Sequence, residues 1–375
     1  MKIEESALRE DIAEGLSVEQ IAEKHGVSKR AVQYRVKRII EKGYSPQHQM
    51  VHEVPEGYLV KGTSTYYNKE GKPGQQWVKS RIDPGREREI IKEFIESINS
   101  ELPRYDAVPA PSLSIRQGRH LNLFPITDYH LGMLAWGEES GDDWDIKIAE
   151  ALVIKWLEQA IKSAPQAGTA VLANIGDFLH WDGLSAVTPQ SQHVLDADSR
   201  YTKLVRVAIR IIRVMIQMLL ETHDKVHVIM AEGNHDESGS VWLRETLPII
   251  YENEPRITFD QSSDPYYCYE FGKVALGFHH GHKANFKRVE SAMLGKFRAV
   301  FGRTEHFYCH TGHLHHLKMD ETTTMVIEQH RTLAAKDAYA SRGGWLSQRA
   351  ASVITYDSEF GEVSRSVITP AMLQY

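Results

Sequence analysis

The chain has 375 residues, of which 42% are hydrophobic and 25% are charged, and its formal net charge is −6. This composition is typical of a globular protein and excludes a largely disordered chain, and the length is typical of two or three domains. The net charge excludes nucleic-acid binding through bulk charge, so such binding requires a local basic patch. The 19 histidines are an unusually large number and point to metal chemistry.

The sequence predicts a cytoplasmic protein without a membrane span. Its most apolar helical stretch, Val205 to Leu220, is interrupted by Arg206, Arg210 and Arg213, and no apolar signal region opens the chain. Two cysteines are too few for a disulfide scaffold, which favours a reducing compartment.

Residues 1–45 are predicted to form a small all-α helix-turn-helix domain. Ser17 and Gln20 have the spacing of a capping box, and Gly26 ends the helix that they begin. Ser28 then has the position of the next N-cap. The expected core consists of apolar residues at helical spacing, Ile21, Ala22, Val27, Val32, Val36 and Ile39.

The basic charge of this domain gathers on its last helix. Residues 24–43 contain seven Lys and Arg against one acid, whereas residues 1–23 contain seven acids and two bases. We therefore expect DNA as a partner, bound mainly at its phosphates. The expected contacts are Lys29, Arg30, Gln33, Arg35, Lys37 and Arg38. The alternative is a helical bundle used for oligomerisation, and a homo-oligomer is compatible with the sequence.

Residues 46–118 are interpreted as a middle segment and linker. Short strands are predicted at 58–60 and 76–82, a helix at 85–98, and a proline-rich linker at 102–112. Aromatic residues are interleaved with basic ones, namely Tyr58, Tyr66, Tyr67 and Trp77 with Lys61, Lys69, Lys72, Lys79 and Arg81. This mixture fits nucleic-acid binding and a small packing sheet equally well.

From residue 119 to 375 short apolar runs alternate with helical stretches, which is typical of an α/β domain. Each of five apolar runs is followed by side chains of the kinds that bind metals. They are Asp128 and His130; Asp177 and His180; Asn234, His235 and Asp236; His279, His280 and His282; and His313 and His315. Ligands gather outside the carboxyl ends of strands in α/β sheets, so we expect the five groups to converge.

The residue types in these groups fit a pair of divalent ions. Carboxylates, imidazoles and an amide oxygen, without thiolates, suit Mn, Fe or Zn better than a structural zinc of the cysteine type. A carboxylate can bridge two ions about 3.5–4 Å apart, the separation used in two-metal phosphoester chemistry. Each motif alone is uninformative, but five in this order are specific.

The ordered set D-x-H, GD-x-x-H, GNHD, HGH and GHxH resembles the calcineurin-like metallophosphoesterase superfamily across residues 119–375. The resemblance implies a four-layer α-β-β-α sandwich, of class α/β (α+β), and two divalent ions, with Mn²⁺ preferred over Fe or Zn. One ion would be held by Asp128, His130, Asp177 and His315. The other would be held by Asp177 as the bridge, Asn234, His280 and His313. His235 would be the catalytic histidine, with Asp236 orienting it.

Two details of the motifs refine this expectation. His280 is chosen among three neighbouring histidines because the family's ligand directly precedes the glycine, and His282 is expected to contact a ligand or the phosphate. The stretch GDFLH resembles the SbcD-like and double-strand-break-repair nucleases. In those nucleases the histidine at the position of His180 helps to place the phosphate and protonate the leaving group. Alternatively, His180 only hydrogen-bonds a ligand.

The sequence therefore predicts a metal-dependent DNA nuclease whose helix-turn-helix holds or targets DNA, an arrangement compatible with a phage or mobile element. The chain departs from the named nucleases because it has an N-terminal helix-turn-helix and no C-terminal segment for a coiled-coil partner. One alternative is a phosphatase or cyclic-nucleotide phosphodiesterase acting on a small phosphoester, with the helix-turn-helix used for assembly. A non-enzymatic DNA-binding regulator is a further alternative, which the complete ligand set disfavours.

Overall fold

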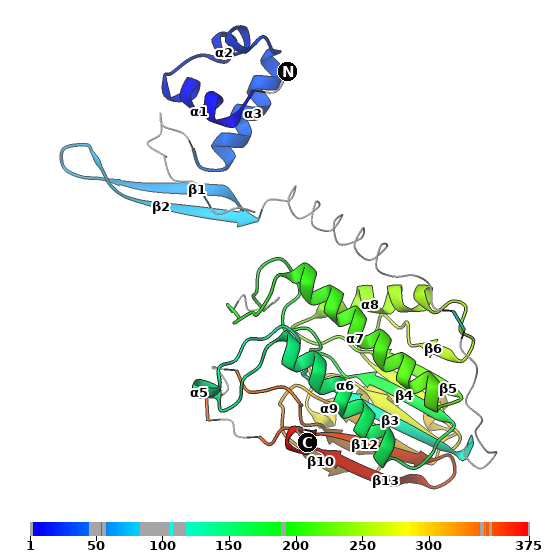
Figure 1. Ribbon diagram of the computed structural model, residues 1–375. Helices are drawn as coiled ribbons and strands as arrows, with labels where there is room; N and C mark the ends of the chain where they lie inside the picture. Colours follow the sequence, from blue (N-terminus) through cyan, green and yellow to red (C-terminus); the bar gives the residue numbers. More distant parts are fainter. Residues whose placement is uncertain are drawn as a thin grey trace. The chain divides into compact units, whose positions relative to one another are not determined.

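Helices and strands of the computed structural model fall into two units, Met1–Ser97 and Ile98–Tyr375 (Figure 1). The structure describes residues 3–44, 54, 58–82, 106–107, 118–188, 193–337, 341, 343–344 and 347–373. The division falls inside the predicted middle segment. The helix predicted at 85–98 and most of the linker at 102–112 lie outside the described residues.

Three helices form the start of the first unit: α1 (Glu5–Ala13), α2 (Val18–His25) and α3 (Lys29–Glu41). The Ser17 side chain accepts a hydrogen bond from the Gln20 amide, and the Gln20 side chain accepts one from the Ser17 amide. Gly26 ends α2 at a φ of 61°, a left-handed conformation that glycine adopts without strain. The buried core is formed by Leu8, Ile12, Ile21, Ala22, Val32 and Ile39.

An antiparallel hairpin follows, formed by β1 (Tyr58–Tyr67) and β2 (Pro73–Ile82). Both strands have ten residues, so β1 is much longer than the predicted 58–60. Tyr66, Tyr67 and Trp77 are exposed. Both interpretations of this aromatic and basic segment therefore stay predictions.

The second unit contains two sheets. The first has the order β13-β12-β3-β4-β5-β6. Its strands β3 (His120–Ile126), β4 (Thr169–Asn174), β5 (Lys225–Met230) and β6 (Ile257–Phe259) are parallel. β12 (Ala351–Asp357) and β13 (Gly361–Ile368) complete it in antiparallel pairing.

The second sheet has the order β10-β11-β9-β8-β7. β8 (Val274–Phe278), β9 (His306–Thr311) and β11 (Val326–Gln329) are parallel. The antiparallel edge strands are β7 (Tyr267–Phe271) and β10 (Lys318–Glu321).

The two sheets pack face to face because alternate residues of their strands share one core. Leu121, Leu123 and Val171 of the first sheet belong to the same buried cluster as Leu276 and Phe278 of the second. This packing uses the two-residue period of the strands, which leaves the other face of each sheet for helices.

Helices pack on these other faces. On the first sheet, Phe124 of β3 contacts Trp156 of α6 (Ile146–Ser163), and α7 (Tyr201–Thr222) and α8 (Glu237–Ile250) contact β5. On the second sheet, Val289 and Met293 of α9 (Phe286–Lys296) pack on Phe307 of β9. Short helices α5 (Gly137–Ser140), α10 (Arg298–Phe301) and η3 (Pro370–Leu373) complete the unit. The predicted mixed α/β class is confirmed.

None of the helices that the structure describes combines the length and the apolar character needed to cross a membrane.

Candidate metal centre

The structure brings all seven predicted metal ligands together at strand ends. Asp128 and His130 follow β3, Asp177 follows β4, and Asn234 follows β5. His280 follows β8 of the other sheet, and His313 and His315 follow β9.

The potential ligand atoms form two overlapping groups. Those of Asp128, His130 and His315 lie within 4.8 Å of one another, as do those of Asp128, Asp177, His280 and His313. Asn234 adjoins the second group, because its Oδ1 lies 3.2 Å from His280 Nε2.

Short distances link the members of each group. His315 Nε2 lies 3.1 Å from Asp128 Oδ1 and 3.4 Å from His130 Nε2. His280 Nε2 lies 3.1 Å from Asp177 Oδ2. Lone pairs of imidazoles and carboxylates thus converge in a partly buried space, as metal coordination requires.

The backbone at these residues is strained. Within the described part of the chain, five non-glycine residues have a positive φ: Asp128, His130, Asp177, His313 and His315. All five are predicted ligands. A left-handed conformation costs an L-residue about 1–2 kcal/mol, and such strain persists where the surrounding structure enforces it, typically at functional sites.

At two positions of the motifs only glycine fits, because other atoms lie very close to the backbone there. A Cβ on Gly233 would lie 2.0 Å from Asp177 Oδ1, and one on Gly312 would lie 1.8 Å from Thr127 Oγ1. The GNHD and GHxH motifs therefore need glycine because their backbones pack directly against the ligand loops.

One oxygen of Asp128 is left without a hydrogen bond. Its Oδ2 accepts from Thr127 Oγ1 at 2.6 Å and from the His313 amide at 2.8 Å. Its Oδ1 is buried and has no hydrogen-bond partner among the described residues. This oxygen lies 3.1 Å from His315 Nε2, which is itself a candidate ligand, and a bound cation would satisfy both atoms.

The electrostatics of the site also favour a cation. Burial alone would lower the pKa of His280, but the charges of Asp177 and Asp128 outweigh it and raise that pKa to about 10. Burial would raise the pKa of Asp128, yet the charges of His315 and His280 hold it well below its usual range. The carboxylates thus favour a positive charge at this place, which a divalent ion would supply instead of a proton on His280.

Hydrogen bonds to residues outside the ligand set orient the ligands. His280 Nδ1 donates to the Ile175 carbonyl at 2.8 Å, which leaves Nε2 facing Asp177. Thr332 Oγ1 donates to the Asp128 carbonyl at 2.7 Å. Sequence reasoning missed Thr332, since it follows no motif and lies 204 positions from Asp128.

The carboxylate common to both groups is Asp128, whereas the predicted bridge was Asp177. Asp177 Oδ1 accepts a hydrogen bond from the His235 amide at 2.8 Å, so one of its oxygens is already engaged. Asp128 Oδ2 is engaged in the same way by the His313 amide, so the bridging role of Asp177 stays a prediction.

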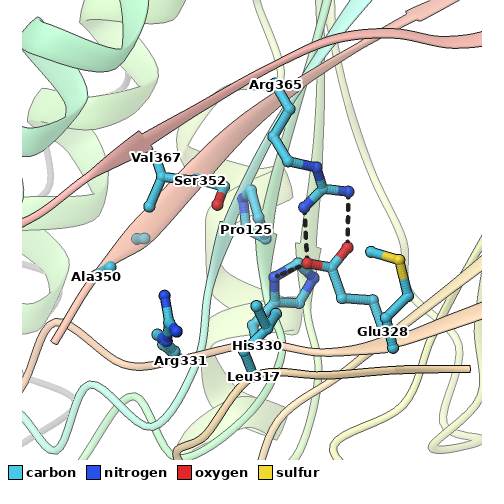
Figure 2. Close-up of a pocket in the computed structure, with 11 residues that line it drawn as sticks. Pro125, Leu317, Glu328, His330, Arg331, Ala350, Ser352, Arg365 and Val367 are labelled. Carbon is cyan, nitrogen blue, oxygen red and sulfur yellow. Dashed lines mark hydrogen bonds and ion pairs between the residues drawn. The ribbon is translucent and has the colours of Figure 1, made fainter. Parts of the chain in front are cut away.

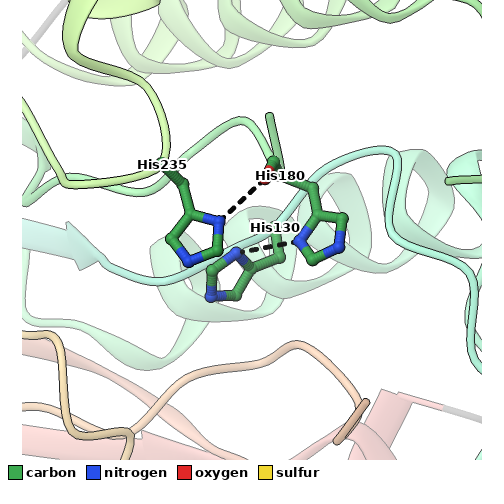
Figure 3. A group of neighbouring side chains, drawn as sticks. All are labelled: His130, His180 and His235. Atoms are coloured by element: carbon green, nitrogen blue, oxygen red, sulfur yellow. Dashed lines mark hydrogen bonds between the residues drawn. The ribbon is translucent and has the colours of Figure 1, made fainter. Parts of the chain in front are cut away.

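His235, the predicted catalytic histidine, has a defined ring orientation. Its Nδ1 lies 2.8 Å from the His180 carbonyl oxygen and must donate a hydrogen bond to it (Figure 3). The other ring nitrogen, Nε2, is therefore the one that can take up or release a proton. Its ring centroid lies 4.7 Å from that of His130. His235 lines a cavity of about 810 Å³ together with His130, Asp177 and His315.

His180 also lines this cavity, but its Nδ1 lies 3.3 Å from His130 Nδ1 (Figure 3). The other nitrogen of His130 faces His315. Burial lowers the pKa of His180 to about 3, which makes it a neutral hydrogen-bond partner. This geometry favours the alternative in which His180 hydrogen-bonds a ligand.

The predicted role of Asp236 is wrong. Its carboxylate accepts hydrogen bonds from the backbone amides of Asp177, Leu179 and Gly233 at 3.0–3.2 Å. The His180 carbonyl, not Asp236, is the partner of the His235 ring. Burial and the charge of Asp177 raise the pKa of Asp236 to about 7. Asp236 thus joins the second and third motif loops.

The remaining histidines of the fourth motif differ from His280. His279 stacks on Tyr266 with ring centroids 4.3 Å apart, and its Nδ1 accepts from the Gly281 amide. The ring of His282 lies 5.3 Å from that of His280, and neither of its nitrogens has a hydrogen-bond partner among the described residues.

The predicted DNA contacts on α3 fall into two sets. Lys29, Arg30, Gln33 and Lys37 are exposed. Arg35 is half-buried, and its Nη1 donates to the Ile3 carbonyl at 2.8 Å, so it does not extend from the surface as predicted. Arg38 is also half-buried and lies 3.7 Å from Glu41.

Comparison with known proteins gives weak likenesses. No family model and no curated protein matches the chain. Solved structures match about two thirds of it. A conserved Streptococcus pneumoniae protein described as a predicted phosphoesterase shares 10% identity over 66% of this chain and 97% of its own, with a TM-score of 0.29. Vps29 from Entamoeba histolytica, complexed with zinc, shares 11% identity over 66% of this chain and 99% of its own, with a TM-score of 0.30. An archaeal phosphodiesterase shares 12% identity over 66% of this chain and 99% of its own, with a TM-score of 0.33.

Proposed function

We propose that the second unit is a phosphodiesterase that uses two divalent metal ions. The observation that carries this proposal is the pair of ligand groups that overlap at Asp128. They lie beside the cavity that His235 lines. Two-metal sites of mixed nitrogen and oxygen ligands are the usual solution for hydrolysis of phosphoesters.

Two sets of side chains would hold the ions. One set is Asp128, His130 and His315, and the other is Asp128, Asp177, Asn234, His280 and His313. All ligands are nitrogen or oxygen atoms, which suits Mn²⁺ first and Fe or Zn as alternatives. When bound, such ions polarise the phosphate and lower the pKa of water.

The chain's own residues supply orientation and a proton. His235 donates from Nδ1 to the His180 carbonyl, so its Nε2 is the atom that can hold and deliver a proton to a leaving oxygen. The His180–His130 hydrogen bond fixes the ring of a ligand. Asp236 holds the loops that carry Asp177 and His235.

We also propose membership of the calcineurin-like metallophosphoesterase superfamily, with its four-layer sandwich. Two facing sheets with helices packed on the other face of each support this arrangement. The five ordered motifs support it independently.

DNA is the proposed substrate. On α3, Arg30, Gln33, Tyr34 and Lys37 have the i, i+3, i+4, i+7 spacing of one helical face, and all four are exposed. A short helix with this exposed basic face suits the major groove and its phosphates. Arg35, which is turned toward Ile3, is left out of the proposed contact set.

Digestion of labelled single- and double-stranded DNA, beside an aryl phosphodiester and an aryl phosphomonoester, tests the proposal. We expect Mn²⁺-dependent cleavage of DNA and of the diester, abolished by a chelator. Ready hydrolysis of the monoester with intact DNA would instead indicate a small-molecule phosphatase.

The role of α3 is tested separately by DNA binding. The double variant Arg30→Ala/Lys37→Ala should reduce the slope of log K against log salt by about 1.8 on duplex DNA, because two phosphate contacts are removed. Lys162→Ala on α6, where Lys162 pairs with Glu158, is the matched control. An unchanged slope in the double variant would favour assembly as the role of this domain.

A further inference from the structure

A second cavity, of about 510 Å³, lies next to the candidate metal centre. It shares Leu314 and His316 with the cavity of that centre, so the segment after β9 lies between the two. Gly312, beside the ligand His313, also lines it. A ligand that fills both cavities would therefore cross this segment.

The second cavity is positively charged. Lys283, Arg288 and Lys318 line it, and none of its described lining residues is Asp or Glu. This is unusual in a chain with a net charge of −6. Such a concentration of cations attracts an anion.

Packing positions these cations. The Lys318 ammonium lies 4.5 Å from the centroid of the Phe286 ring, a cation–π contact that keeps it at the cavity. Arg288 lies in the first turn of α9, which Asn285 caps. Among the described residues, no carboxylate pairs with the Arg288 guanidinium. Lys283 differs, since it lies 3.2 Å from Glu237.

His282 connects this cavity with the metal centre. It lines the cavity, and its ring lies 5.3 Å from that of His280 and 6.2 Å from that of His313. Both of its ring nitrogens are shielded from solvent and have no hydrogen-bond partner among the described residues. Unsatisfied buried polar atoms beside a basic cavity indicate a polar ligand.

We propose that this cavity binds the phosphate next to the one being cleaved, so that the substrate is a polynucleotide strand and not a mononucleotide. The inference rests on the proposed phosphodiesterase function. Arg288 and Lys318 bind the neighbouring phosphate, which a mononucleotide lacks. Leu314, 57% exposed between the cavities, offers an apolar contact to the nucleoside that joins the two phosphates.

The test uses the full chain and the double variant Arg288→Ala/Lys318→Ala. Lys287→Ala is the matched control, because Lys287 adjoins Arg288 on α9 and does not line the cavity. Binding of a fluorescent single-stranded oligonucleotide is followed by anisotropy in chelator at several salt concentrations. The slope of log K against log salt should fall by about 0.7 in the double variant, because one phosphate contact is lost, and stay unchanged in the control.

A second readout compares substrates with Mn²⁺ present. The ratio of kcat/KM for the oligonucleotide to kcat/KM for an aryl phosphodiester should fall on the order of tenfold in the double variant only. Equal salt slopes for the three proteins would overturn the inference, as would an unchanged ratio. If wild-type protein cleaves the diester but neither binds nor cleaves the oligonucleotide, the inference fails while the phosphodiesterase stands. If wild-type protein cleaves neither substrate, the proposed function fails, and the salt slope still decides whether the cavity binds phosphate.

Discussion

Two buried groups of histidine and carboxylate side chains lie in the second unit, and they differ in what neutralises them. At the candidate metal centre, Asp128 Oδ1 faces the imidazoles of two other candidate ligands, His315 at 3.1 Å and His280 at 3.9 Å. In the other group, formed by His310, Glu328 and His330, both oxygens of Glu328 accept from Arg365, at 2.7 and 2.8 Å. Figure 2 shows this ion pair at the edge of a cavity of about 100 Å³.

The second group is a closed hydrogen-bonded network. His310 Nδ1 lies 2.9 Å from His330 Nε2, and His310 Nε2 lies 3.1 Å from the Tyr356 hydroxyl. Burial would raise the pKa of Glu328, but the charge of His330 and the hydrogen bonds from Arg365 outweigh it and lower that pKa to about 2.

The two groups also differ in their backbone conformation. Asp128 and His315 have a positive φ, whereas His310, Glu328 and His330 do not. Ligand types within reach of one another are therefore not sufficient for a metal site. Converging ligand atoms on a strained backbone favour a metal site at the first group, whereas the pairing of Glu328 with Arg365 favours a structural network at the second.

The largest expected effect is that of Asp128→Asn. Asp128 belongs to both ligand groups, so the variant should lose most of both ions. Its activity should fall by more than that of the variants below, because the proposed chemistry needs both ions. Elemental analysis and rates on an aryl diester measure this. A variant that keeps both ions would show that Asp128 is not shared.

His235→Ala should lower activity by about 10²–10⁴-fold, because it removes the proposed proton donor. Its metal content should stay at the wild-type value, since His235 is not assigned as a ligand. Loss of ions from this variant would instead identify His235 as a ligand.

Glu328→Gln should destabilise the fold by about 3 kcal/mol while leaving the metal content unchanged, because it breaks a buried ion pair. The free energy of unfolding in urea measures the loss. Glu362→Gln is the matched control: Glu362 pairs with the same Arg365 but is 26% exposed, so its loss should be smaller. A reduced metal content in Glu328→Gln would mean that the second group binds an ion.

His180→Ala should have the smallest effect, about 10–100-fold on metal affinity, because it removes the partner of His130. Activity should fall equally on DNA and on an activated aryl phosphate. A much larger loss on DNA would restore the role in leaving-group protonation that the GDFLH motif predicted.

Local signals in the sequence predict part of this molecule. The capping box of Ser17 and Gln20 and the turn at Gly26 predict α2 because the interactions involved span three or four residues. The alternation of apolar runs and helical stretches likewise predicts a mixed α/β unit. The motif pattern identifies the side chains that converge, because each follows a strand.

The finer contacts of the site could not be predicted in this way. The partners of Asp236 include Leu179, 57 residues away, and Arg35 turns to Ile3 across the helical core. One oxygen of Asp177 is likewise engaged by the amide of His235, 58 residues away. These hydrogen-bond partners are determined by tertiary packing, and the spacing of residues along the chain does not predict them.

The number of metal ions per chain tests the central claim most directly. The unmodified 375-residue chain, loaded with Mn²⁺ and freed of excess metal, is measured by elemental analysis. The two ligand groups around Asp128 predict two ions per chain. A value near zero would contradict the metal centre, and a value of three would contradict the distinction between it and the His310, Glu328 and His330 network.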